Sequence, residues 1–181
     1  MNTNTSILGR SAWAMALAAV VSSTAARPLG AAEGDRAACA DLAGTYVTVF
    51  TDREGVFSSR GLMTFTSDGV LLVTDSAQGG VPGVWDPFSS AHGAWSCQGA
   101  DGGKLTVSAM GLNFVLPADG RTPTFARVDY QAGLEVKTGT LSGSATLHIG
   151  AGKDLEGADP VVRPGRLVDE FHFEGARVVV K

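Results

Sequence analysis

The sequence predicts an all-β protein, folded as a closed or nearly closed antiparallel up-and-down barrel of about eight strands. Two observations point to this class. The chain holds 24 glycines and 7 prolines, and short segments rich in β-branched and aromatic residues recur between them, one of them alternating strictly between polar and apolar residues. Eight or nine strands that are each polar on one side must close on themselves or pack on a second sheet, and we favour closure.

The first 32 residues have the pattern of a signal peptide and processing region. Arg10 precedes an apolar run over residues 12–21, which small residues follow. Cleavage after Ala26 and cleavage after Ala32 both fit this pattern. The run is too short to span a bilayer, and no later segment approaches the roughly 20 apolar residues that a spanning helix needs. We therefore expect one secreted or periplasmic domain over residues 33–181, without membrane insertion.

The charge balance argues against an anionic partner. The chain carries 14 basic and 18 acidic residues, for a net charge of −4. Removal of the first 32 residues, which contain Arg10, Arg27 and no acid, makes the remainder more acidic still. Nucleic acids and anionic membranes both favour clustered lysine and arginine, so neither is an expected partner.

The two cysteines, Cys39 and Cys97, predict one disulfide, because an exported chain with an even cysteine count usually pairs them. The bond would connect the N-terminal segment to the body of the domain. A catalytic thiol and a two-cysteine metal site are the alternatives, and no histidine or acid stands at ligand spacing for the second.

Strands are expected throughout the chain after a helical turn over residues 38–42. The best local signal is Ser67-Asp68-Gly69 between two apolar runs, which predicts a hairpin. Gly111 lies inside a long strand and indicates a bulge or a sharp bend. The expected strands cover residues 44–50, 61–66, 70–74, 94–97, 104–116, 124–136, 140–149, 167–173 and 176–180.

Residues 140–149 show the clearest alternation, with one polar and one apolar face. The apolar face includes Gly143, Ala145 and Leu147, and Tyr130 and Ala132 share the apolar face of the strand before it. Small inward residues leave room in the lumen for one small ligand, as an eight-stranded barrel allows. A fully packed interior is the alternative.

Candidate ligand contacts come from the apolar faces and from the long connection over residues 75–91. Tyr130 places its ring inside and its hydroxyl near a ligand or a backbone carbonyl, and Leu147 is inward on its strand. Trp85 and Phe88 lie in the connection, which is long enough to be a lid or binding loop. These two aromatics either cap an apolar ligand or plug one end of the core.

The candidate catalytic residues are His92, Asp75 and Tyr130. His92 follows the long connection and Asp75 begins it, and a histidine near an acid is able to move a proton. An exposed or hydrogen-bonded His92 is the alternative. Glu170 and His172 face the same way on a strand, opposite Phe171, and we expect the phenylalanine side to be the buried one.

Nucleotide, hydrolase and metal chemistry find no support in the motifs. The sequence has no phosphate-binding glycine loop, no dinucleotide fingerprint and no nucleophile elbow. The histidines at 92, 148 and 172 do not have the spacing of a zinc motif. We expect no cofactor and no metal.

Gly44-Thr45-Tyr46 on the first strand, together with Arg177 on the last, resembles the lipocalin arrangement in which a Gly-x-Trp strand start packs against an arginine. Val128-Asp129-Tyr130 resembles the Thr-Asp-Tyr turn of that family. Tyr46 stands in place of the tryptophan, and Val128 in place of the threonine. The strand-rich layout over residues 43–181 also resembles the allene oxide cyclase barrel of cofactor-free cyclases and isomerases, at the level of architecture alone.

Three functions follow as hypotheses. The first is a secreted barrel that binds a small apolar molecule in its lumen, and the second is a cofactor-free isomerase or cyclase acting on a small hydrophobic substrate. The third is a structural or protein-binding domain. An ionisable group inside the cavity would favour chemistry, whereas a wholly apolar lumen would favour carriage.

Overall fold

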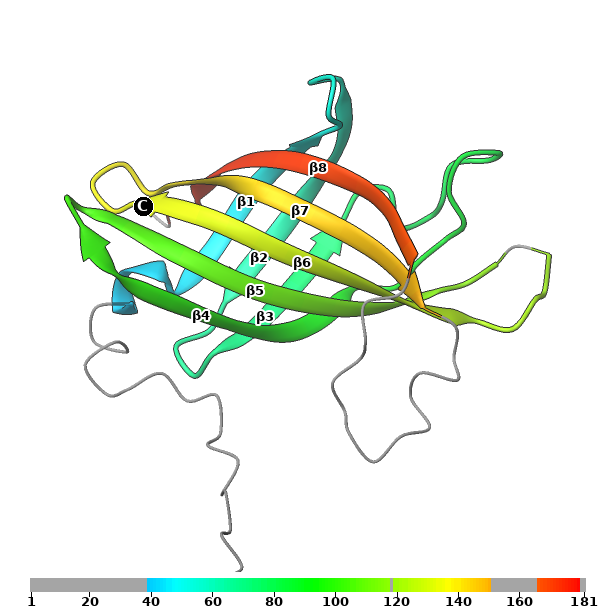
Figure 1. Ribbon diagram of the computed structural model, residues 1–181, viewed down its shortest axis with the longest axis horizontal. Coiled ribbons are helices and arrows are strands. Elements are labelled where there is room, and N and C mark those ends of the chain that lie inside the picture. Colours follow the sequence, from blue (N-terminus) through cyan, green and yellow to red (C-terminus); the bar gives the residue numbers. More distant parts are fainter. Residues whose placement is uncertain (1–38, 118, 151–165, 180–181) are drawn as a thin grey trace, which may run out of the picture. The chain divides into compact units, whose positions relative to one another are not determined.

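The computed structural model describes residues 39–117, 119–150 and 166–179. Each strand pairs antiparallel with the next, and the last pairs with the first, so the sheet closes into an eight-stranded barrel (Figure 1). The predicted fold class is thereby confirmed. The strands are β1 (Gly44–Thr51), β2 (Phe57–Phe65), β3 (Val70–Asp75), β4 (Ala91–Asp101), β5 (Lys104–Val115), β6 (Thr124–Glu135), β7 (Thr140–Gly150) and β8 (Arg166–Arg177).

The expected division of the last strand was wrong, and one of the two alternatives for Gly111 is excluded. The two strands expected at 167–173 and 176–180 are one strand, β8, and Gly175 continues its ladder opposite Thr48 and Leu141. A Cβ atom at position 175 would lie 2.5 Å from the Thr48 methyl group. Gly175 therefore allows β8 to pack closely against β1, and it does not end the strand. The ladders on both sides of β5 keep their register through Gly111, so no bulge occurs there.

One end of the barrel is packed shut. The 3-10 helix η1 (Ala40–Leu42) places Leu42 in the core, where Leu42 and Tyr46 are both 0% exposed. The Tyr46 hydroxyl donates to the Leu42 carbonyl at 3.0 Å and accepts from the Arg177 Nη2 at 2.8 Å. The Arg177 guanidinium also lies 5.4 Å from the centre of the Tyr46 ring. Further large side chains fill this end: Met63, Phe65, Leu105, Leu134 and Leu141.

The disulfide between Cys39 and Cys97 is present, with Cα atoms 6.0 Å apart. Cys39 immediately precedes η1 and Cys97 lies on β4. The bond therefore fixes the helix that closes this end to the wall of the barrel, as predicted. The expected signal peptide and processing region, residues 1–32, lies outside the described residues. No helix in the described part of the chain has the length and hydropathy needed to cross a membrane.

Replacing both cysteines by serine is expected to lower the free energy of unfolding by about 4 kcal/mol, because the disulfide closes a loop of 58 residues in the unfolded chain. Urea unfolding followed by circular dichroism measures this change. Wild-type protein treated with a thiol reductant is the control and should unfold at the midpoint of the double variant. Equal midpoints for oxidised and reduced protein would contradict the structural role of the bond.

Candidate functional site

The other end of the barrel encloses a cavity of about 320 Å³, which is within the usual range for small-molecule sites. Three alanines from three strands make this space: Ala91 on β4, Ala126 on β6 and Ala145 on β7. Each is buried and projects only a methyl group from the wall. Large side chains occupy the corresponding positions at the closed end. The cavity thus results from a change in side-chain size along the barrel axis.

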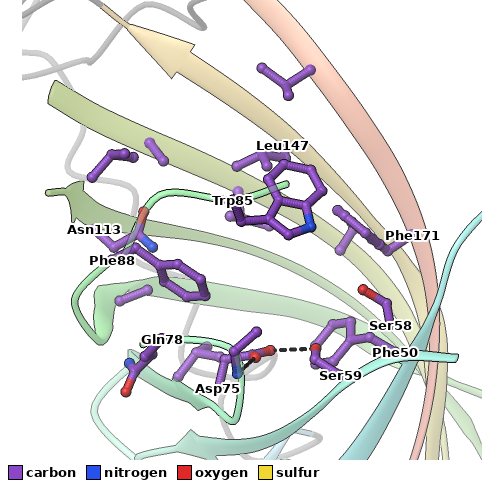
Figure 2. A pocket seen from close by; sticks show the side chains of 18 of the residues that line it. Phe50, Ser58, Ser59, Asp75, Gln78, Trp85, Phe88, Asn113, Leu147 and Phe171 are labelled. Carbon is purple, nitrogen blue, oxygen red and sulfur yellow. Dashed lines mark hydrogen bonds between the residues drawn. The ribbon is translucent and has the colours of Figure 1, made fainter. Parts of the chain in front are cut away.

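The connection between β3 and β4 lies over the mouth of this cavity. Backbone hydrogen bonds hold it to the end of β5: Ser89 N–H donates to the Phe114 carbonyl at 2.9 Å, and Leu116 N–H donates to the Pro87 carbonyl at 2.7 Å. Trp85 contacts Phe171 on β8, with ring centres 6.4 Å apart. Since β5 and β8 are not neighbours in the barrel, the connection reaches from one side of the mouth towards the other (Figure 2).

A carboxyl group belongs to this largely apolar lining. Asp75, the last residue of β3, accepts a hydrogen bond from the Ser59 hydroxyl at 2.7 Å and another from the Ala77 N–H at 2.7 Å. Figure 2 shows Asp75 and Ser59 side by side at the cavity wall. Two donors on different segments therefore fix the orientation of this carboxyl group.

Tyr130 lies deeper, on β6, and is 4% exposed. Its ring packs edge to face with Phe173, with centres 6.1 Å apart. Tyr130 lines the cavity, and no described residue makes a hydrogen bond to its hydroxyl. Burial raises the pKa of Tyr130 well above its usual value, and the negative charges of Asp75 and Asp129 raise it further. The phenol therefore stays protonated at neutral pH and is able to donate a hydrogen bond.

The structure brings most of the predicted site residues together. The four candidate ligand contacts, Tyr130, Trp85, Phe88 and Leu147, all line the cavity, and so does Asp75.

His92 does not line the cavity. It is exposed on β4, where it pairs with Leu72 on the outer surface of the barrel. A catalytic role for His92 stays a prediction, and one that would have to act outside the cavity.

The other ionisable candidates face outward. Phe171 and Phe173 point into the barrel, so Glu170 and His172 are exposed, and Glu170 pairs with Arg53 at 3.1 Å. The His148 side chain is only 17% exposed, because it lies in a cluster with Asp129, 3.8 Å away.

Sequence analysis missed several lining residues. Ser59 is one of them, because the strand was expected to begin at residue 61 and instead begins at Phe57. The available signal was its position two residues before Gly61 and four before Met63, on the buried face of the strand. Asn113 is another. Its amide nitrogen donates to the Ser89 carbonyl at 3.4 Å, whereas its buried amide oxygen has no partner among the described residues.

No family model, curated protein or solved structure matches this chain. The Tyr46–Arg177 contact agrees with the resemblance to lipocalins, but a relationship to lipocalins or to allene oxide cyclases stays a prediction. Within the described residues, no group of three or more histidine, cysteine, aspartate or glutamate side chains is placed to hold a metal ion.

The two tyrosines form a matched pair for a stability test. Tyr46→Phe should lower the free energy of unfolding by about 1–3 kcal/mol, because it leaves the buried Leu42 carbonyl without its partner and removes an acceptor from Arg177. Tyr130→Phe should change it by less than about 1 kcal/mol, since no described hydrogen bond is lost. Urea unfolding of both variants measures the difference. An equal loss in both would contradict the assigned contacts.

Proposed function

We propose that this protein binds a small, predominantly apolar molecule in the open half of its barrel. The observation that carries the proposal is the cavity of about 320 Å³ with four predicted ligand contacts in its lining. Such a volume, mostly apolar with a few polar groups, is typical of small-molecule sites. We also propose a secreted or periplasmic location, which the Cys39–Cys97 disulfide and the sequence pattern of residues 1–32 support.

The neutral fluorophore N-phenyl-1-naphthylamine, whose emission rises in apolar surroundings, tests this proposal. We expect saturable binding to the wild type and at least about tenfold weaker binding to Ala126→Leu, because the larger side chain occupies the cavity. Ser142→Leu is the matched control. Its side chain is exposed on the outer face of β7, so binding should not change. Equal affinities for all three proteins would show that the probe does not enter the cavity.

A second candidate function is a cofactor-free isomerase or cyclase. It is favoured by Asp75 and Tyr130, an acid and a phenol that line one cavity. In this proposal the Asp75 carboxylate accepts a proton from the substrate while the Tyr130 hydroxyl donates a hydrogen bond to the oxygen where negative charge develops. The same proton returns to a different atom, so the product is an isomer of unchanged mass.

Comparison of the molecules that copurify with different variants separates carriage from chemistry. Wild type, Asp75→Asn and Glu174→Gln would be isolated from the same culture medium, and their ligands identified by native mass spectrometry and chromatography. If the protein is an isomerase, Asp75→Asn should hold a compound of the same mass but different retention. The control, Glu174→Gln, changes a carboxyl group exposed on β8 outside the cavity and should hold the wild-type compound. One identical compound in all three proteins would contradict catalysis by Asp75.

A further inference from the structure

The charges in the cavity lining all have one sign. Among the described lining residues the carboxyl groups are those of Asp75 and Asp86, and none of these residues is a lysine, arginine or histidine. Asp86 belongs to the connection over the mouth, where Arg121 lies 3.4 Å away. Asp75, by contrast, forms no ion pair with any residue in the described ranges. The cavity therefore contains one carboxyl group whose charge no described cation balances.

We propose that Asp75 makes this cavity selective for neutral or cationic apolar molecules that carry a hydrogen-bond donor, such as a hydroxyl or amine, and excludes carboxylic acids. This inference rests on the proposed ligand-binding function and specifies the chemical class of its ligand.

The acceptors of the cavity have capacity for such a donor. Each Asp75 oxygen accepts one described hydrogen bond, from Ser59 or from Ala77, whereas a carboxylate offers about four lone-pair positions. The Asn113 amide oxygen is a second acceptor, and it is buried without a partner in the described part of the chain. A buried acceptor without a partner is costly. A ligand hydroxyl or amine that reaches either group would satisfy it.

An anionic ligand is disfavoured in this cavity. A carboxylate moved from water into this lining loses its hydration and finds only neutral donors there, such as the Tyr130 hydroxyl. It is also repelled by Asp75, and this repulsion is stronger in an apolar cavity than in water. Two of the cations near the open end are already paired, Arg53 with Glu170 at 3.1 Å and Arg121 with Asp119 at 2.6 Å.

Displacement of N-phenyl-1-naphthylamine by octanol, octylamine and octanoate at neutral pH tests the selectivity, since these three molecules share one apolar chain. We expect octanol and octylamine to displace the probe from the wild type, and octanoate to require at least a tenfold higher concentration. Asp75→Asn keeps an acceptor and removes the charge, so it should reduce the difference between octanol and octanoate severalfold. Glu174→Gln, which removes a carboxyl group that is exposed on β8 outside the cavity lining, should leave this difference close to that of the wild type.

Loss of the charge selectivity and loss of ligand binding give different results in this experiment. Octanoate displacing the probe as readily as octanol, or an unchanged octanol-to-octanoate difference in Asp75→Asn, would overturn the inference while probe binding stands. Absence of probe binding to the wild type would overturn the proposed function and this inference together. The wild-type series remains decisive even if a variant does not fold.

Discussion

Closure of the barrel by the pairing of β1 with β8 is the constraint on which the rest of the structure depends. Thr48 lies at the middle of β1, is 0% exposed, and has a glycine opposite it on each side, Gly61 on β2 and Gly175 on β8. A side chain at Gly61 would lie 2.8 Å from the Phe50 ring, and one at Gly175 would lie 2.8 Å from the Val47 carbonyl. Without these glycines, the inner side chains of β1 would collide with both neighbouring strands.

Closure also explains why one barrel has a packed end and a hollow end. Closure surrounds the lumen with the inward side chains of the eight strands, so the size of these side chains along the barrel axis decides which part of the lumen is filled. Leu42, Tyr46 and Leu141 fill one end completely. At the other end, alanines on β4, β6 and β7 leave the space that the connection after Asp75 covers. The packed end stabilises the fold and the hollow end is free to serve binding.

The sequence predicted the closed barrel and its local turns better than the packing between strands. Asp68-Gly69 and the alternation over residues 140–149 are local signals, and both were confirmed because turn chemistry and the period of two act over a few residues. The single strand β8 was missed, because the need for Gly175 comes from Thr48 on another strand. Long-range packing of this kind leaves no mark in the local pattern.

Small inward residues were expected to leave room in the lumen, with a packed interior as the alternative, and the residues that make the cavity are partly different ones. Ala145 lines it as expected, whereas a side chain at Gly143 would lie only 2.1 Å from the Gln131 carbonyl, so that space belongs to the β6 backbone. Ala91 and Ala126 were not singled out, because they meet Ala145 only after the strands have taken their register and closed. The same holds for Ser59 and Asp75, which are 16 residues apart and hydrogen-bond across β2 and β3.

The position of Asp75 gives the strongest reason to connect this cavity with molecular recognition. Placing an ionisable group in a largely apolar lining costs free energy that a residue such as leucine would not incur. Ser59 and Ala77 offset part of this cost through hydrogen bonds, but they hold the carboxyl group at the cavity wall. Asn113 adds a buried acceptor whose hydrogen-bonding capacity the described residues do not satisfy. These unused acceptors at the cavity wall do not stabilise the fold. They support the proposal of a ligand that donates hydrogen bonds to them.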